Sequence, residues 1–394
     1  MVKCPRCFNQ LDDRYVFACL SVNCATKKPD PVVTEQLGEG FTAEIGHRVE
    51  LTRPVSNPNW IPPQGMNCPE CRQPESEVCR FCHYPLPNGY HQGESICIAF
   101  AGARSTGKSL YIAVAVAYLK LFATEQMGWV LTEAANTKTK EIYQVNYERP
   151  LFEQRGMLAG TVRGHQLGAP QRDPLIYEVT GKRLTDRWFV VLRDVAGEDL
   201  QQPGQLPQHL NYLKRADTVL FLFDPLALKQ VADRLHGIAS HNVDGAYANT
   251  VLDNLANLIG AGTGHFVPDL GLVISKFDVL QELHRHEDKR WNAMWKNYGS
   301  CFVRDTSMDE PAYNEQEGEL LDAEVKSLLS TLHAGSFLTR LNNSRLPYRF
   351  FVVSALGRPP KGDSLNAHGL SPFQVIRPIK WAMARRGLLP TKNG

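Results

Sequence analysis

The amino-acid sequence predicts an α/β fold, in which a mostly parallel sheet carries helices on both faces and small cysteine-rich modules precede it. Three observations predict this arrangement. Eight of the ten cysteines fall in four close pairs within the first 82 residues. From residue 96 onward, apolar runs of strand character alternate with helical patterns, and the first run ends in a glycine-rich turn. Polar motifs directly follow the later runs, as they do where parallel strands end at one edge of a sheet.

The composition fits a globular protein of two or three domains. The chain has 394 residues, of which 43% are hydrophobic and 21% charged, which excludes wholesale disorder. The net charge is +2, so no overall field draws the chain toward nucleic acid or membrane. The N-terminus lacks the pattern of a signal peptide, and the longest apolar stretch, Tyr111–Ala123, contains Lys120 and is shorter than the ~20 residues of a membrane span. We expect no transmembrane segment and a cytoplasmic location.

The four cysteine pairs predict two structural zinc sites. Three pairs have the spacing C-x2-C and one has C-x4-C; they are Cys4/Cys7, Cys19/Cys24, Cys68/Cys71 and Cys79/Cys82. Two such pairs place four thiolates around one tetrahedral ion, and four thiolates leave no open position for catalysis. Because intracellular thiols rarely form structural disulfides, zinc is the better interpretation.

The sequence leaves open how the cysteines divide between the two ions. In the simple grouping, the first two pairs bind one ion and the last two pairs bind the other. A crossed grouping, in which the first pair joins the third, satisfies the same spacings. Only seven residues separate Cys71 from Cys79, which favours a local second site, and CPECRQPESEVCRFC resembles the paired knuckles of zinc ribbons. We therefore expect a zinc-binding module at 1–28, an extended linker with a hairpin at 29–66 and a second ribbon at 67–90.

The zinc modules are expected to contact a protein partner. Residues 1–95 carry nine Lys/Arg and eleven Asp/Glu, whereas binding to a phosphate backbone needs a basic stripe. Nucleic acid is therefore not favoured. The remaining cysteines, Cys97 and Cys301, stand beside apolar residues and are expected to be inert buried thiols.

A phosphate-binding loop is predicted after the apolar run that begins at Ile96. The segment GARSTGKS matches G-x-x-x-x-G-K-[ST], and an apolar helical pattern follows it. Backbone N–H groups of such a loop surround the phosphates, its lysine reaches the β- and γ-phosphates, and its hydroxyl binds Mg²⁺. The predicted nucleotide-binding residues here are Gly102, Arg104, Ser105, Thr106, Gly107, Lys108, Ser109 and Leu110. Lys108 is also expected to act in catalysis and Ser109 to bind magnesium.

Four later segments favour GTP over ATP. RWFVVLRDVAGE ends in the pattern D-x-x-G, in which Asp194 would hold Mg²⁺ and the Gly197 N–H would sense the γ-phosphate. TVLFLFDP is a further apolar strand that ends in Asp224. LGLVISKFD resembles the guanine motif [NT]-K-x-D; here Asp278 would accept the N1–H and N2–H of guanine, and the stem of Lys276 would cover the base. RFFVVSALG adds a loop expected to support the base from the opposite side, formed by Ser354, Ala355 and Leu356.

In this order, the motifs make residues 95–394 similar to the translation-factor and Ras-like (TRAFAC) class of P-loop GTPases. GARSTGKS, PLIYEVTG before RWFVVLRDVAGED, FLFDP and SKFD resemble most closely the prokaryotic double-GTPase families. The resemblance implies a three-layer sandwich that binds GTP or GDP with Mg²⁺, hydrolyses GTP and acts as a switch in bacterial defence or stress. Because this chain has one P-loop, a double arrangement would need a second chain.

Two positions depart from the usual GTPase pattern. Ser275 stands where Asn or Thr is usual, which weakens the bracing of the guanine loop without removing Asp278. Glu198 stands where a glutamine positions the attacking water, and its charge near the γ-phosphate predicts slow hydrolysis without an activator. Arginines that would supply a catalytic cation in cis are Arg155, Arg163 and Arg172, although each alone is more often a solvated surface charge.

The switch I threonine is predicted to be Thr161, a further magnesium ligand, in the glycine-rich run GMLAGTVRG; Thr180 and Thr185 are alternatives. The predicted catalytic set is Lys108, Thr161, Asp194, Gly197 and Glu198. Insertions at 225–265 and 280–345 are expected to carry partner contacts. A second hypothesis is a non-hydrolysing scaffold that acts through its zinc ribbons. An ATPase is disfavoured because Val195, not a second acidic residue, follows Asp194.

Overall fold

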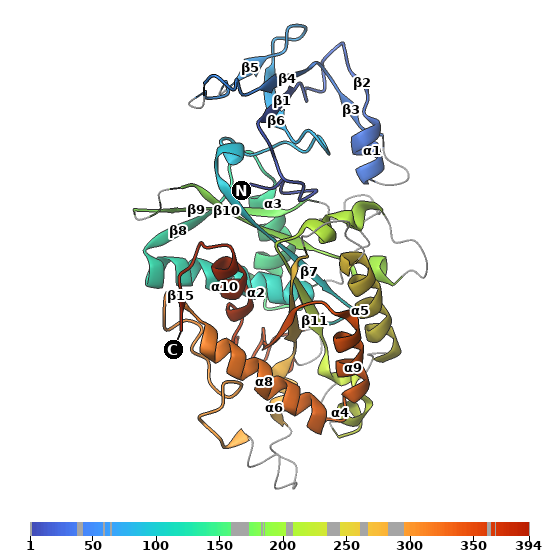
Figure 1. Ribbon diagram of the computed structural model, residues 1–394, viewed down its shortest axis with the longest axis vertical. Helices are drawn as coiled ribbons and strands as arrows, with labels where there is room; N and C mark the ends of the chain where they lie inside the picture. Colours follow the sequence, from blue (N-terminus) through green and yellow to red (C-terminus); the bar gives the residue numbers. More distant parts are fainter. Residues whose placement is uncertain are drawn as a thin grey trace.

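Within the described residues of the computed structural model, seven strands form the central sheet, in the order β14-β12-β11-β7-β10-β9-β8 (Figure 1). Their bounds are β7 (Glu94–Gly102), β8 (Trp129–Glu133), β9 (Leu175–Gly181), β10 (Trp188–Asp194), β11 (Thr218–Phe223), β12 (Asp269–Ile274) and β14 (Tyr348–Val352). The strands from β14 to β10 run parallel, β9 is antiparallel to β10, and β8 is antiparallel to β9. The structure describes residues 2–37, 42–57, 60–63, 65–158, 173–182, 184, 186–201, 208–234, 245–260, 267–282, 295–360, 364–366 and 368–393.

The central strands are apolar because both faces of the sheet are covered. Every residue of β11 is buried, and β7 and β12 are buried beyond their first residue. Such continuous apolar runs are typical of parallel strands between two helical layers. The predicted α/β fold with a mostly parallel sheet is therefore confirmed.

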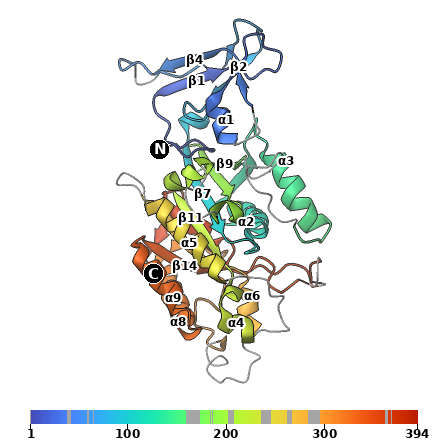
Figure 2. The ribbon, with the colours of Figure 1, turned by 90° about the vertical axis from the view of Figure 1, so that its right-hand side faces the viewer.

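Helices pack on both faces of the sheet (Figures 1 and 2). Their bounds are α2 (Lys108–Phe122), α3 (Thr139–Tyr143), α4 (Lys229–Arg234), α5 (Gly245–Gly260), α6 (Phe277–Gln281), α8 (Glu315–Thr331), α9 (Gly335–Ser344) and α10 (Arg377–Arg385). A π-helical turn extends α2 to Met127, and another follows α3 over Gln144–Glu153.

Strand register places α2 and α9 on opposite faces. Phe100 of β7 contacts Tyr111 of α2, and Leu220 lies beside Phe100 in the register of β11 and β7, so both side chains point to the face of α2. Phe223, three residues after Leu220, points to the other face and contacts Phe337 of α9 at 4.4 Å between ring centroids. The sheet therefore lies between two helical layers.

The N-terminal lobe is a second, smaller sheet at one end of the molecule (Figure 1). Its order is β4-β1-β6-β5, with β1 (Arg14–Ala18), β4 (Arg48–Thr52), β5 (Met66–Asn67) and β6 (Pro74–Val78). A separate pair, β2 (Lys28–Pro29) and β3 (Glu44–Ile45), lies beside the helix α1 (Pro31–Leu37). The run 44–52 therefore pairs with β2 and β1 and does not fold back on itself as the predicted hairpin.

One helix in the described part of the chain, Lys108–Met127, has the length and composition of a candidate membrane span. Half of it is buried inside the fold, and it begins at the glycine-rich loop after β7. Its apolar character is thus accounted for by packing against the sheet. The last short strands, β13 (Tyr313–Asn314) and β15 (Thr391–Lys392), pair beside α10.

Candidate nucleotide site and cysteine clusters

The loop between β7 and α2 has the backbone geometry of a phosphate-binding loop. Gly102 has φ +143° and Gly107 has φ +84°, and a Cβ at Gly102 would lie 2.4 Å from the Leu222 carbonyl oxygen. Only glycine fits at Gly102 without displacing β11. The Lys108 ammonium donates to the carbonyl oxygens of Gly102 at 2.9 Å and Ala103 at 3.0 Å. Burial lowers the pKa of Lys108, while the carboxylates of Asp194 and Glu198 act in the opposite direction.

A hydroxyl and a carboxylate meet where α2 begins. Asp194 ends β10, the parallel neighbour of β7, and its Oδ2 accepts a hydrogen bond from the Ser109 hydroxyl at 2.9 Å. The other carboxylate oxygen, Oδ1, is buried and has no hydrogen-bond partner among the described residues. Burial raises the pKa of Asp194, against the effects of Lys108 and the Ser109 hydrogen bond. An unpartnered buried oxygen beside a hydroxyl fits the oxygen ligands that Mg²⁺ prefers.

The segment after Asp194 lies directly on the phosphate loop. A Cβ at Gly197 would stand 2.6 Å from the Arg104 backbone nitrogen and 2.8 Å from the Ala103 carbonyl carbon. The next residue, Glu198, forms an ion pair with Arg104, with 3.4 Å between Oε1 and Nε. The glycine of D-x-x-G therefore touches the loop backbone through its bare α-carbon, which a larger residue would prevent.

The two motifs predicted to surround a guanine base, K-x-D and S-A-L, meet through a short hydrogen bond. The Ser354 hydroxyl donates to Asp278 Oδ1 at 2.5 Å, and the Gly357 N–H donates to the same hydroxyl at 2.8 Å. Burial raises the pKa of the Asp278 carboxyl, whereas the Ser354 hydrogen bond lowers it. The serine thus fixes one carboxylate oxygen of Asp278. Ala355 and Leu356 continue this loop after β14.

An acidic residue braces the guanine-motif loop from the neighbouring strand. Lys276 adopts the left-handed conformation, with φ 49°, and its ammonium pairs with Asp224 Oδ2 at 2.6 Å. The Ser275 hydroxyl donates across the sheet, to the Phe223 carbonyl oxygen at 3.1 Å. The sequence predicted that Asp224 ends an apolar strand, but no sequence pattern predicted its ion pair with Lys276.

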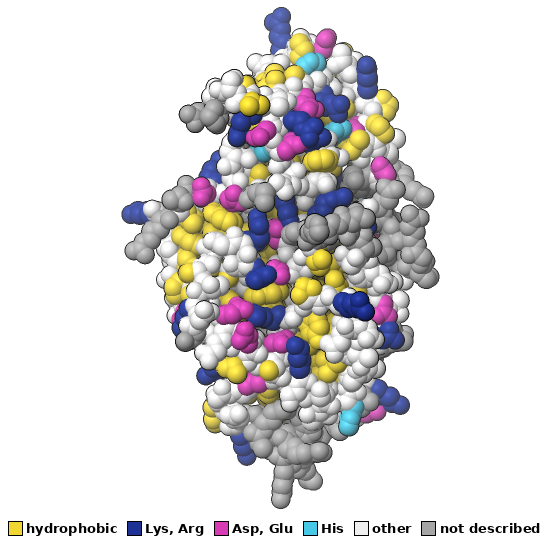
Figure 3. Space-filling view, viewed as in Figure 1, with side chains coloured by type: hydrophobic (Ala, Val, Ile, Leu, Met, Phe, Trp, Pro, Cys, Tyr) yellow, Lys and Arg dark blue, Asp and Glu magenta, His cyan; other side chains and the backbone are white. Residues whose placement is uncertain are grey.

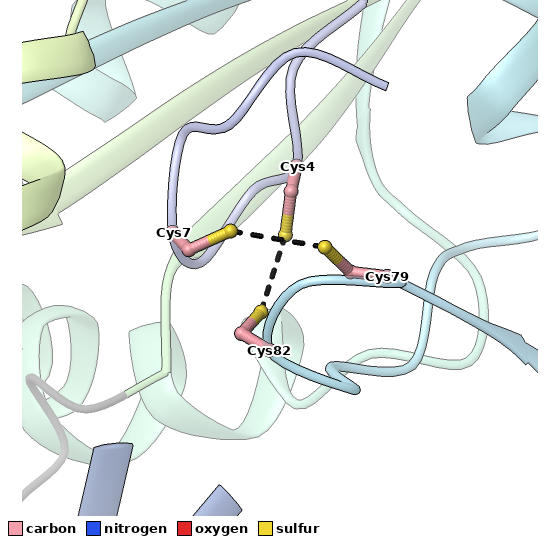
Figure 4. A group of neighbouring side chains, drawn as sticks. All are labelled: Cys4, Cys7, Cys79 and Cys82. Atoms are coloured by element: carbon pink, nitrogen blue, oxygen red, sulfur yellow. Dashed lines mark hydrogen bonds between the residues drawn. The ribbon is translucent and has the colours of Figure 1, made fainter. Parts of the chain in front are cut away.

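The eight predicted zinc ligands form two clusters. Within each cluster, all four sulfur atoms lie within 4.8 Å of one another. The proximal cluster consists of Cys4, Cys7, Cys79 and Cys82 (Figure 4), and the distal cluster consists of Cys19, Cys24, Cys68 and Cys71. Contacting sulfur atoms within the clusters lie 3.5 to 3.8 Å apart. Four thiolates around zinc at ~2.3 Å stand about 3.8 Å apart, whereas a disulfide needs ~2.05 Å. The clusters fit zinc.

The grouping of neighbouring pairs favoured from the sequence is wrong, and so is the crossed grouping of first with third. The first pair joins the fourth, and the second joins the third. The reason is the antiparallel pairing of β1 with β6, in which Val16 lies opposite Val78 and Ala18 opposite Ser76. Cysteines before β1 therefore meet those after β6, and cysteines after β1 meet those before β6.

The proximal cluster is continuous with the core of the domain that contains the central sheet. Arg193, the residue before Asp194, is buried; its guanidinium donates to the Arg6 carbonyl oxygen and lies 3.7 Å from the centroid of the Tyr212 ring. Lys3 is paired with Asp217 at 2.6 Å, just before β11. Its backbone N–H donates to the Ser95 hydroxyl of β7 at 2.8 Å.

A curated protein matches this chain over its whole length. It is the "Putative ESX-1 scaffolding and assembly protein SaeC" of Mycolicibacterium smegmatis, 39% identical over 395 residues that cover 99% of this chain and 100% of that protein. The chain belongs to the SaeC family. No family model matches it.

Among solved structures, two of the S. cerevisiae Ski7 GTPase-like domain align with this SaeC-family chain. One is bound to GTP and the other to GDP and inorganic phosphate, and the TM-scores are 0.32 and 0.31 at 10% identity. Each alignment covers 75% of this chain but only 51% of the Ski7 chain, about half its length. A likeness this weak carries no argument about function. The resemblance to double-GTPase families is not confirmed by these comparisons.

Of the remaining predicted site residues, some lie in or beside the phosphate loop, one lies in an outer strand, and others lie outside the described residues of this SaeC-family chain. Thr106 is buried and its hydroxyl donates to the Ala103 carbonyl oxygen at 2.9 Å, Ser105 is an exposed residue of the loop, and Leu110 lies in the first turn of α2. Thr180 lies in β9, opposite Val130 of the edge strand β8. Thr161, Thr185, Arg163 and Arg172 lie outside the described residues.

Proposed function

We propose that this SaeC-family chain binds GTP with Mg²⁺ and is a slow GTP-hydrolysing switch that acts on a protein partner. The observation that carries the proposal is a meeting of motifs distant in sequence at one edge of the sheet. Ser109 contacts Asp194, 85 residues away, and Ser354 contacts Asp278, 76 residues away. Both contacts join segments that follow the carboxyl ends of parallel strands, where open α/β sheets bind ligands.

At the phosphate end, the loop from Gly102 to Ser109 would surround the phosphates with backbone N–H groups and the start of α2. Lys108 would exchange its two loop carbonyl partners for the β- and γ-phosphates. Ser109 and Asp194 would hold Mg²⁺, with Thr161 as the proposed third protein ligand. When bound, the ion neutralises charge that develops on the phosphates. The Gly197 N–H, already beside the loop, would report whether a γ-phosphate is present.

At the base end, Asp278 would distinguish guanine from adenine. Its carboxylate accepts the paired N1–H and N2–H donors of guanine, which adenine lacks. Ser354 keeps one carboxylate oxygen oriented, and Lys276, anchored by Asp224, would lie along the base. Ala355 and Leu356 would complete the opposite wall.

A nucleotide-binding scaffold that does not hydrolyse GTP is the second candidate. The observation that favours it is the ion pair between Glu198 and Arg104, which engages the carboxylate expected to orient water. The SaeC relative is named for ESX-1 scaffolding and assembly, which supports protein partners under either hypothesis. Figure 3 shows basic and acidic side chains interspersed over the visible face, as suits contact with protein. We propose that the zinc lobe or the segments within 225–265 and 280–345 make these contacts, in the cytoplasm.

The test is the affinity of the zinc-loaded full chain for GTP, GDP and ATP with Mg²⁺. We expect a preference for guanine nucleotides that Asp278→Ala removes. Hydrogen bonds to a charged group contribute ~1.5–3 kcal/mol each, so losing two should weaken GTP binding by roughly 100-fold or more. Asp253→Ala, at an exposed carboxylate on α5, is the control. Equal binding of ATP and GTP that Asp278→Ala leaves unchanged would refute the GTPase assignment, and single-turnover hydrolysis separates the switch from the scaffold.

A further inference from the structure

Arg104 occupies an unusual place in the phosphate loop. It is the second variable residue of GARSTGKS, and its backbone nitrogen lies against the bare α-carbon of Gly197. Its side chain is 71% exposed, so packing does not hold it in one position. The one ion pair that the described residues give it is with Glu198, whose side chain is only 12% exposed. A solvent-exposed cation is thus paired with a largely buried anion at the contact between the phosphate loop and the D-x-x-G segment.

This contact lies at the γ-phosphate end of the loop. In a P-loop the lysine reaches the β- and γ-phosphates, and the glycine of D-x-x-G senses the γ-phosphate. This chain has both features. The Lys108 ammonium donates to the carbonyl oxygens of Gly102 and Ala103, and the α-carbon of Gly197 lies against the backbone of Ala103 and Arg104. Among the described residues, the charged groups that interact at this point are Lys108, Arg104, Asp194 and Glu198.

These four charges cancel only if Arg104 is counted. Without Arg104, two carboxylates face one lysine, and the charge of Glu198 would repel the γ-phosphate of a bound GTP. Because GDP has no γ-phosphate, this charge would weaken the binding of GTP more than that of GDP. With Arg104, the carboxylate is neutralised, and the planar guanidinium also offers the two-pronged donor geometry that phosphate oxygens accept.

We propose that Arg104 is the residue that distinguishes GTP from GDP, by moving its guanidinium from Glu198 to the γ-phosphate. The proposal rests on the proposed function, because it assumes a guanine nucleotide at this loop. The Arg104–Glu198 pair and an Arg104–γ-phosphate contact are alternative uses of one side chain. GDP leaves Arg104 on Glu198, whereas GTP draws it away and releases the carboxylate toward the space where an attacking water would stand.

The experiment compares affinities for GTP and GDP, each with Mg²⁺, in the zinc-loaded full chain and its variants. Arg104→Ala is expected to weaken GTP binding by roughly 10- to 100-fold, the value of a hydrogen-bonded charge, and GDP binding by less than about threefold. Arg104→Lys keeps the positive charge but lacks the two-pronged guanidinium. Its GTP affinity should therefore lie between those of the wild type and Arg104→Ala. Adding Glu198→Gln to Arg104→Ala removes the repulsion by the unpaired carboxylate but not the loss of the Arg104 contact, so it should restore part of the GTP affinity, a non-additive result that no general loss of fold produces.

Arg340→Ala is the matched control, because Arg340 is an exposed arginine paired with Asp253 between α5 and α9, away from the loop. It should leave both affinities unchanged. Equal losses for GTP and GDP in Arg104→Ala, or no loss for either, would overturn the assignment of Arg104 while leaving nucleotide binding intact. Wild-type protein that binds neither GTP nor GDP would overturn the proposed function and this inference together. A preserved GDP affinity in each variant reports that the loop is still folded.

Discussion

The ring of Phe8 meets the ring of Tyr212 edge to face, with 5.2 Å between centroids and 84° between planes. Phe8 follows the second cysteine of the proximal cluster, and Tyr212 lies in the 3₁₀ helix Gln208–Arg215, which follows the D-x-x-G segment. Arg193, next to Asp194, lies over the same tyrosine ring. The proximal cluster therefore supports the segment that is proposed to respond to the γ-phosphate, whereas the distal cluster lies in a separate part of the zinc lobe.

Loss of the proximal ion should change nucleotide binding. Cys7→Ser is expected to lower the zinc content by one ion per chain and to weaken GTP binding about fivefold or more, the lower end of typical coupling between sites. Cys24→Ser should lose one ion from the distal cluster with nucleotide affinity unchanged. Metal analysis and GTP titration of both variants provide the check. Phe8→Ala, which keeps all ligands, should reproduce the weaker GTP binding with full zinc content. Equal effects of the two cysteine variants would contradict the coupling.

Asp224 is expected to position the guanine loop. It is buried, pairs with Lys276 and accepts a hydrogen bond from the Leu226 N–H at 2.9 Å. Asp224→Asn removes the negative charge but keeps an oxygen that can accept the hydrogen bond from Leu226. GTP and GDP affinities should fall together by roughly 10-fold, the loss of one charged hydrogen bond. Calorimetric titration with both nucleotides measures this. Asp269→Asn, at an exposed ion pair with Arg385 at the opposite end of β12, should show no change. A loss confined to GTP would place Asp224 at the phosphates instead.

A methyl group at Gly197 should separate the D-x-x-G segment from the phosphate loop. Its nearest neighbours are backbone atoms of Gly102, Ala103 and Arg104 at 2.6 to 2.9 Å, which cannot move aside cheaply. Gly197→Ala is therefore expected to weaken GTP binding by about 10-fold or more and GDP binding little. In the control Gly335→Ala, the added methyl meets no atom within 4 Å. Unchanged GTP binding in Gly197→Ala would show that the segment does not need this close contact.

Lys380 should make the free energy of unfolding depend on pH in the alkaline range. Its ammonium is buried over the Phe122 ring and donates to the carbonyl oxygens of Ser307 and Glu310. Burial, then the charge of Arg377, lowers the pKa of Lys380 to about 8, below the ~10.4 of an unfolded lysine. Between these values the unfolded chain binds more protons, so the free energy of unfolding should rise with pH.

Denaturant unfolding of wild type and Lys380→Met at pH 7 and 9.5 isolates this effect. The free energy of unfolding of the wild type should rise relative to that of the variant between the two values, because methionine has no proton to lose. A constant difference would mean that Lys380 keeps its ordinary pKa in the fold.

The sequence was informative where a motif is contiguous and follows its own strand. GARSTGKS, D-x-x-G, K-x-D and S-A-L each follow a buried apolar run, so a parallel sheet brings their first residues to one edge. The roles of these residues remain predictions. Contacts between side chains of different loops were not predicted, since Arg104–Glu198 and Asp224–Lys276 depend on backbone paths that no local pattern specifies.

The cysteines illustrate the same limit. Their chemistry follows from residue type and spacing, and both clusters contain only predicted ligands. Their grouping depends on which strand lies beside β1, and β6 lies there in antiparallel orientation. Spacing alone favoured the local pair because a short loop closes at lower entropic cost. The pairing of β1 with β6 overrides that preference.

The observed grouping of the cysteines, first pair with fourth and second with third, also sets the order in which the two clusters can be completed during synthesis. The distal set is complete once residue 71 has left the ribosome, whereas Cys4 and Cys7 must wait for Cys79 and Cys82, partners 72 or more positions later. Cys4 and Cys7 are thus synthesised before the distal cysteines, but their cluster can be completed only after the distal one, shortly before β7 emerges. A zinc ion in the proximal cluster would then link the segment around Cys4 and Cys7 to the chain just before β7, so a change in that segment is expected to affect the proposed GTP site.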